Sequence, residues 1–296
     1  MSQQAFLSRI LDYAGMFPPA ALALEPALER YASYRGHFML GGFILAVARL
    51  ADLTAQPLFQ QGQWPLVLLG SALSHPASAQ RLAEADVEAV AGELGGRLGQ
   101  DVRLEGVEIT PAPEALAELG PAARAQVPLY TQLSDGLQVF YEVRGTDFAA
   151  LEGSGAGLKI RAGGVTADRF PTARELAAAL AAWGPLSVPL KLTAGLHQPL
   201  PHYDPELEVR QHGFLNVFAA AMLARRDQLD AGSLEAILGL DRPEHFRFTP
   251  GGLELPGHQL SLQDITTLRQ VVKGFGSCSF EEPLEALTAH GFLEAP

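Results

Sequence analysis

The amino-acid sequence predicts an α/β fold: a (β/α)8 barrel of the TIM type with an N-terminal helical extension. Short apolar runs of strand length alternate with helical patterns along the chain, which is typical of a mostly parallel sheet with helices outside it. Runs such as PLVLLG, from residue 65, lack polar alternation, as strands buried on both faces do. The length of 296 residues also suits a barrel, for which about 250 residues is typical.

The expected strands are short, and the helices follow them in turn. We place strands at 43–47, 65–71, 102–110, 138–143, 157–161 and 188–195, with two more at Arg247 and near Phe275. Helical patterns cover 3–13, 22–35, 77–96, 113–125, 172–183, 213–226, 233–240, 261–273 and 283–292. Residues 127–143 fit a hairpin or a loop followed by one strand, and we favour the second.

The chain is expected to form one domain over residues 1–296, with 1–36 as a helical extension that packs on a barrel of about 37–296. A doubly wound open sheet is the main alternative. Neither GxGxxG nor GxxxxGK[ST] follows an early strand, so the usual nucleotide-binding reasons to prefer that fold are missing.

Composition limits the partners. The net charge is −12 and no basic run stands out, which argues against a nucleic-acid surface. No window reads as a membrane span or a signal peptide. Cys278 is the single cysteine, which fits a reducing compartment. We therefore expect a cytoplasmic protein that binds neither nucleic acid nor membrane, and leave open whether it forms a homo-oligomer.

Lysine is rare in this chain, with 3 Lys against 18 Arg. Two of the three, Lys159 and Lys191, lie inside apolar runs of strand length, GLKIR and VPLKLTAG. Strand alternation places Lys159 with Arg161, and Lys191 with Thr193, on the faces opposite the leucines. In a barrel these side chains point inward, near the C-terminal ends of the strands where active sites lie.

Two interpretations of this cationic wall remain open. Crowded cations in a buried site disfavour protonation, so a lysine there could act as a nucleophile or base, or the wall could bind an anionic substrate. Alternatively, the cations pair with interior carboxylates such as Glu108 and Glu142. Gly163 and Gly164 follow Arg161 and could let an anion approach backbone N–H groups, or could form a plain turn.

Three histidines flank the loop after the second lysine strand. His197, His202 and His212, with Asp204 between them, could hold a metal ion, although the spacing matches no named zinc signature. His197 could instead act as a general acid or base, with His202, His212 and Asn216 contacting substrate. A surface loop with ordinary polar histidines is the third interpretation.

The motif GSCSFEEP begins at residue 276, at the last strand–helix junction. Cys278 there could be a nucleophile if its pKa is lowered, or a small buried residue. Ser279 and Glu282 fit a capping box for the closing helix, although Glu281 or Glu282 could instead turn into the site.

The motif LDYAGMFPPA, residues 11–20, combines an acid, an aromatic residue and a proline pair. It could cap one end of the barrel and contribute Asp12 or Tyr13 to the site. A helix stop with aromatic packing explains it equally well.

These motifs together resemble those of a family of uncharacterised bacterial proteins that share DYAGxFPPA, KIRxGG, TAGLHxP, HGFLN and GSCSFxEP. The similarity extends over nearly the whole chain, so it implies one continuous domain. It implies no reaction. At the level of chemistry, lysines on neighbouring barrel strands are also similar to those of class I aldolases, an analogy of fold and residue type only.

The leading hypothesis is a barrel enzyme, a lyase of aldolase type or an isomerase, for a small anionic metabolite with a carboxylate or phosphate. Lys191 or Lys159 would be the reactive amine, Arg161 would bind the anion and His197 would move protons. No cofactor is expected. One alternative is a metal-dependent hydrolase or lyase using the histidine loop, and another is a non-catalytic binding protein on a barrel frame.

Overall fold

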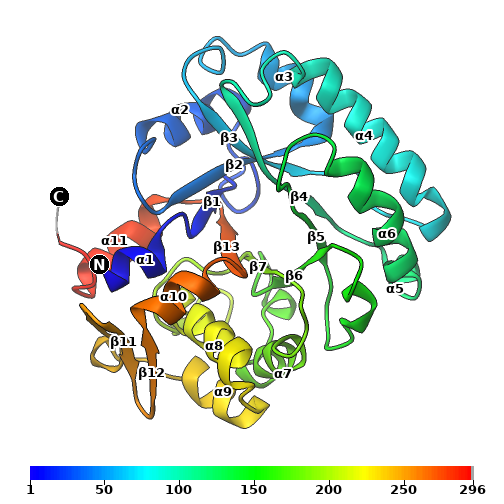
Figure 1. Ribbon diagram of the computed structural model, residues 1–296. Coiled ribbons are helices and arrows are strands. Elements are labelled where there is room, and N and C mark those ends of the chain that lie inside the picture. The colour runs from blue at the N-terminus through cyan, green and yellow to red at the C-terminus, as the bar shows by residue number, and fades with distance from the viewer. Residues whose placement is uncertain (295–296) are drawn as a thin grey trace.

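The computed structural model describes residues 1–294 and contains a closed barrel of eight parallel strands with helices around it (Figure 1). The strands, in their order around the barrel, are β1 (Leu11–Tyr13), β13 (Val272–Ser277), β7 (Leu190–Thr193), β6 (Gly157–Arg161), β5 (Val139–Glu142), β4 (Val102–Ile109), β3 (Trp64–Leu69) and β2 (Leu40–Ala46). The predicted TIM-type barrel is confirmed.

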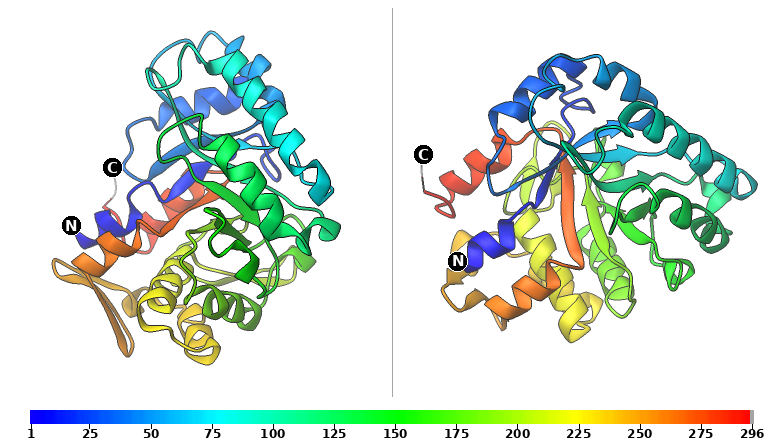
Figure 2. Two further views of the ribbon diagram at one scale, coloured as in Figure 1. Left: turned by 45° about the vertical axis from the view of Figure 1, so that its right-hand side comes forward. Right: turned by 45° about the horizontal axis from the view of Figure 1, so that its top comes forward.

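The helices lie outside the strands in every view (Figure 2). They are α1 (Ser2–Leu7), α2 (Leu24–Ser33), α3 (Leu50–Thr54), α4 (Ala79–Leu94), α5 (Pro113–Leu116), α6 (Leu119–Tyr130), α7 (Ala173–Trp183), α8 (Phe214–Asp227), α9 (Ala231–Leu238), α10 (Leu262–Leu268) and α11 (Glu281–Ala289). Thr172 and Glu175 form the expected capping box of α7. Within residues 1–294, no helix has both the length and the apolar character needed to cross a membrane.

The first barrel strand lies where the sequence predicted a helix. The helix expected over 3–13 ends at Leu7, and β1 follows and pairs in parallel with both β13 and β2. The barrel therefore begins at Leu11 and not near residue 37. A strand of three residues is too short to show a period of two, so the helical pattern before it was extended too far.

The strand expected at Arg247 exists but lies outside the barrel. It is β10 (Arg247–Thr249), which forms an antiparallel sheet with β11 (Gly252–Leu255) and β12 (His258–Ser261). Nearby, the helix predicted to reach Lys273 ends at Leu268, and Lys273 belongs to β13. β1 and β13 thus complete the eight strands.

Two further connections differ in detail from the expectation. Helix α6 extends to Tyr130 and is followed by a loop and the single strand β5, so the favoured interpretation of one strand is confirmed. The long connection after β7 contains a small hairpin of β8 (His202–Asp204) and β9 (Val209–Gln211).

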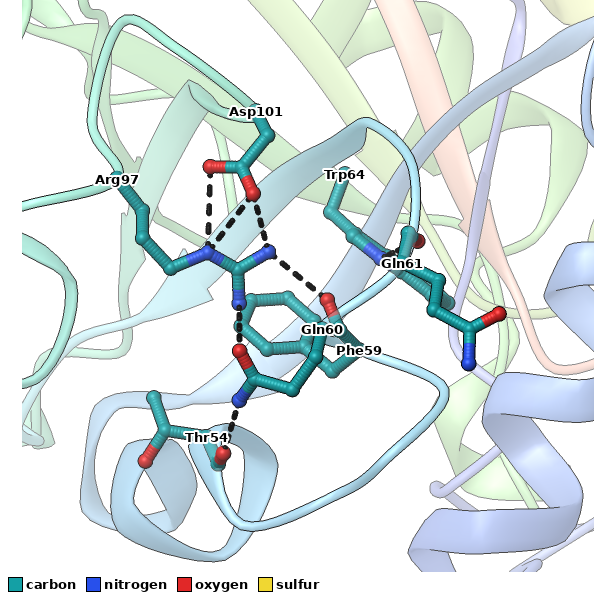
Figure 3. Close-up of polar contacts among 7 residues, drawn as sticks. All are labelled: Thr54, Phe59, Gln60, Gln61, Trp64, Arg97 and Asp101. Carbon is teal, nitrogen blue, oxygen red and sulfur yellow. Dashed lines mark hydrogen bonds and ion pairs between the residues drawn. The ribbon is translucent and has the colours of Figure 1, made fainter.

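Arg97 joins two loops at the amino-terminal end of β3 and β4 (Figure 3). Its guanidinium donates to both carboxylate oxygens of Asp101 and to the carbonyl oxygen of Phe59, at 2.8 Å. The same group lies 4.3 Å from the centre of the Phe59 ring. Because every strong contact of Arg97 is internal, we assign it to structure and not to binding.

The short strand β1 should contribute measurably to the free energy of unfolding. Leu11 is fully buried, so Leu11→Ala should lower the free energy of unfolding by about 2–5 kcal/mol. Val165→Ala, at a side chain that is 52% exposed, should change it by less than about 0.5 kcal/mol. Urea denaturation measures both, and equal effects would contradict the place given to β1.

Candidate functional site

A series of ion pairs crosses the inside of the barrel, and it begins with Asp12 and Lys191. The Nζ atom of Lys191 lies 2.7 Å from Oδ2 of Asp12 on β1 and 2.5 Å from Oε1 of Glu108 on β4. Oδ1 of Asp12 accepts a hydrogen bond of 2.6 Å from the backbone N–H of Gly42. Lys191 is only 4% exposed, so its charge depends on these two carboxylates.

The second half of the series runs through Lys159. Its Nζ lies 2.6 Å from Oε2 of Glu108 and 3.4 Å from Oε2 of Glu142 on β5. Arg161 donates from Nε to Oε1 of Glu142 at 2.7 Å, and from Nη1 to the carbonyl oxygen of Gly163. Glu108 is therefore shared by two lysines, and Glu142 by a lysine and an arginine.

The positive and negative charges of this series of ion pairs balance. The barrel interior is therefore not a cationic wall. Burial would raise the pKa of Glu108, but Lys159 and Lys191 outweigh burial and lower it to about 2. Burial likewise opposes the charge on Lys191, yet Asp12 and Glu108 raise the pKa of this amine instead of lowering it. The alternative that interior carboxylates pair with the lysines is the arrangement found.

A cavity of about 520 Å³ opens at the carboxyl ends of the strands and reaches part of this series of ion pairs. Its polar lining includes Glu108, Glu142, Lys159, Arg161, Thr193 and His197. Phe17, Pro18 and Pro19 line it from the β1–α2 connection, so of the two interpretations of this motif the position at one end of the barrel is the one found. For a non-catalytic binding protein we expect Lys159, Arg161 and Lys191 to be neutralised by carboxylates and to face no open pocket. The three cations are paired with carboxylates, but Lys159 and Arg161 line an open pocket.

His197 lies in the same cavity beside an acid and a thiol. Its Nδ1 is 2.8 Å from Oε2 of Glu282, and Cys278 lines the same cavity. Burial would lower the pKa of His197, but Cys278 and Glu282 raise it to about 9. The imidazole is therefore protonated at neutral pH and can donate a proton.

The other predicted site residues divide between the cavity and the surrounding structure. Gly164 lines the cavity, whereas a Cβ at Gly163 would collide with Phe170, so that glycine serves close packing. His212 hydrogen-bonds to the carbonyl oxygen of Pro171. Buried Asn216 donates to the carbonyl oxygens of Ile237 and Leu240. His202 lies in the β8–β9 hairpin, outside the cavity lining.

The structure does not gather the histidines into a metal centre. Across residues 1–294, no three His, Cys, Asp or Glu side chains stand close enough together to ligate one ion. His197 contacts Glu282, while His212 contacts a backbone carbonyl. The histidine loop therefore offers no support for the metal-dependent alternative.

Three residues of functional interest were missed or undervalued from sequence. Asp12 was one of two residues of its motif proposed for the site, but it lies in a strand where the sequence predicted a helix. Arg169 lines the cavity from a short 3-10 turn, and nothing in its local pattern distinguishes it from other arginines. Lys273 was placed at the end of a helix, yet its rarity as one of three lysines was a signal that could have found it.

Comparisons with known proteins add no relative: no family model, no curated protein and no solved structure matches this chain. The site must therefore be interpreted from its own chemistry.

Glu108→Gln should destabilise the protein strongly, by about 3–5 kcal/mol at pH 7, because it leaves two buried ammonium groups short of a carboxylate. The stabilisation due to Glu108 is complete above its unfolded pKa of 4.5 and is lost as pH falls toward about 2. The difference in free energy of unfolding between the wild type and Glu108→Gln, measured by urea denaturation, should therefore shrink as the pH falls from 4.5 to about 2.

Glu105→Gln is the matched control, because Glu105 lies on the same strand but pairs with Arg9 and Arg103 near the surface. Its effect should stay below about 1 kcal/mol. A Glu108→Gln effect of that small size would contradict the shared role given to this carboxylate.

The raised pKa of His197 predicts a second pH dependence of the free energy of unfolding, with a sign opposite to that of Glu108. Because the folded pKa of His197 is raised from 6.5 to about 9, its stabilisation is complete below pH 6.5 and is lost as pH rises through about 9. The free energy of unfolding should fall over this window in the wild type, and less so in His197→Gln. His75→Gln, at an exposed histidine, should retain the wild-type slope. An unchanged slope in His197→Gln would rule out this origin.

Proposed function

We propose that this protein is a lyase of aldolase type, or an isomerase, that acts on a small anionic carbonyl compound through a Schiff base on Lys159. The observation that carries the proposal is the place of this amine: Lys159 lines an open cavity and lies between two carboxylates. A protonated Schiff base is a cation in the same position, so Glu108 and Glu142 would stabilise it without reorganising.

Lys159 is a better candidate than Lys191 for the reactive amine. Lys191 is absent from the cavity lining, and its raised pKa keeps it protonated. When Lys159 loses its proton, Glu108 still has Lys191 at 2.5 Å and Glu142 still has Arg161 at 2.7 Å. Neither buried carboxylate is then left without a cation nearby, which favours Lys159 as the reactive amine.

His197 supplies the proton that the reaction needs. The ammonium group of Lys159 first gives its proton to solvent through the open cavity. The free amine then adds to the carbonyl carbon of the substrate, one of its protons passes to the carbonyl oxygen, and a carbinolamine forms. Protonated His197 then donates its proton to the carbinolamine hydroxyl, which leaves as water, and the iminium forms. The iminium accepts electrons from the adjacent C–C or C–H bond. The neutral imidazole can take up the proton released when that bond breaks.

The anionic group of the substrate is best placed at Arg169. Arg161 is occupied by Glu142, whereas Arg169 is half exposed and its nearest acid, Asp168, lies 3.7 Å away on the surface. A smaller cavity of about 210 Å³ also contains Arg144, Arg161 and Arg169 and so adjoins the main one. A carboxylate or phosphate there would bind at the edge of the site, away from the reacting carbonyl.

A thiol-dependent transfer or hydrolysis is a second candidate, favoured by one contact. Cys278 and His197 line the same cavity, and His197 contacts Glu282, an arrangement in which the imidazole can activate a cysteine nucleophile. The two candidates separate by mutation: Cys278→Ser abolishes a thiol-dependent reaction and leaves the Lys159 amine intact.

Borohydride trapping tests the leading proposal directly. Incubation with aldehydes and ketones that carry a phosphate or carboxylate, followed by reduction, should attach one substrate molecule, less its carbonyl oxygen, to Lys159. The chain has only three lysines, so peptide mass spectrometry assigns the adduct without ambiguity. Arg169→Gln should lower the yield for anionic carbonyl compounds and leave the yield for uncharged ones unchanged.

Lys159→Met should abolish the adduct, and Lys273→Met, the matched control, should retain it. A panel of carbonyl compounds that gives no adduct at Lys159, or equal labelling of Lys273 and the N-terminus, would sink the proposal.

A further inference from the structure

A second cavity, of about 600 Å³, lies at the amino-terminal mouth of the barrel, the end opposite the first. It is bounded by the α1–β1 connection, the start of β4, the α6–β5 loop, the end of α10 and the start of β13. Lys191 and Asp12 form its inner wall. The interior series of ion pairs thus separates two cavities, and the proposed function uses only one of them.

The lining of this second cavity is cationic although the protein is acidic overall. Its positively charged residues are Arg9, Arg103, Lys191, Arg269 and Lys273, and its negatively charged residues are Asp12, Glu105 and Asp135. The whole chain carries a charge of −12. A positive concavity on such a surface concentrates anions.

Two of these cations lack a carboxylate partner. Arg9 and Arg103 both pair with Glu105. Among residues 1–294, no carboxylate lies within ion-pairing distance of Lys273 or Arg269. Burial, and to a lesser extent the positive charge of Arg269, lower the pKa of Lys273.

Arg269 lines the same cavity as this lysine and is held by backbone carbonyls. Its guanidinium donates to the carbonyl oxygens of Val272 and Ser8, the latter at 3.0 Å, while its buried Nε has no partner. These carbonyls orient the group without neutralising it. Two neighbouring cations that repel each other in a half-buried cavity are an arrangement that a bound anion would stabilise.

We propose that the amino-terminal mouth is a binding site for a polyvalent anion of the phosphate type, held between Lys273 and Arg269. A phosphate group matches the pair because its several oxygens can accept from both cations at once. Gln270 and Ser134 also line the cavity and can donate further hydrogen bonds. The site does not depend on the proposed function, since Lys159 and Arg169 lie in the other cavity.

Isothermal titration calorimetry at constant ionic strength tests the site, with inorganic phosphate and glycerol phosphate as probes and chloride as the reference. The wild type should bind one phosphate group saturably. Lys273→Gln should weaken binding at least about tenfold, the loss expected for one charge-assisted hydrogen bond. Arg81→Gln makes the same charge change at an exposed position of α4 and should leave binding unchanged.

Arg169→Gln separates the two cavities. Binding that survives Arg169→Gln and is lost in Lys273→Gln supports the site, whether phosphate and its ester bind equally or the ester binds more tightly. Binding that is lost in Arg169→Gln and survives Lys273→Gln would move the anion to the first cavity and overturn the proposal. Absence of saturable binding at millimolar phosphate would overturn it as well. Thermal unfolding without ligand shows that each variant is folded.

Discussion

The shared carboxylate of Glu108 is the constraint around which the barrel interior is arranged. It accepts from Lys159 and Lys191, which come from neighbouring strands, at 2.6 and 2.5 Å. Removing water from one carboxylate and two ammonium groups costs free energy that only close pairing can offset. Asp12 and Glu142 complete the compensation on either side. The strands β1, β4, β5, β6 and β7 must therefore reach their final register together for the charges to be satisfied.

The interior of this barrel consequently combines apolar packing with a series of buried ion pairs. The leucines adjacent to the lysines are fully buried and supply the apolar packing, while the opposite faces carry charges. A packed interior holds charged side chains at defined positions, which a loop does less well. The proposed reaction uses that rigidity, because the carboxylates that stabilise the resting ammonium would stabilise the iminium as well.

Much of this arrangement could be predicted from the sequence, and particular residues show where prediction stops. Alternation along β6 and β7 placed Lys159, Arg161, Lys191 and Thr193 inside the barrel, because strand geometry is a local property. Pairing of the lysines with Glu108 and Glu142 was one of two open interpretations, but the pairing of Lys191 with Asp12 could not be predicted, since β1 is distant in sequence and gave no periodic signal. Glu282 was named as a residue that could turn into the site, whereas its contact with His197 and the second cavity have no local signature.

The order of the interior charges along the chain has a consequence for how the barrel can be assembled. Asp12, Glu108 and Glu142 all precede Lys159, Arg161 and Lys191. The N-terminal part up to β5 thus contributes only carboxylates to the ion pairs inside the barrel, and the part from β6 onward contributes only cations. Two copies of either part would face each other with like charges, whereas one of each is electrostatically matched. Domain-swapped or half-barrel pairings between identical parts are disfavoured, and during synthesis the carboxylate-bearing strands remain uncompensated until β6 and β7 have emerged.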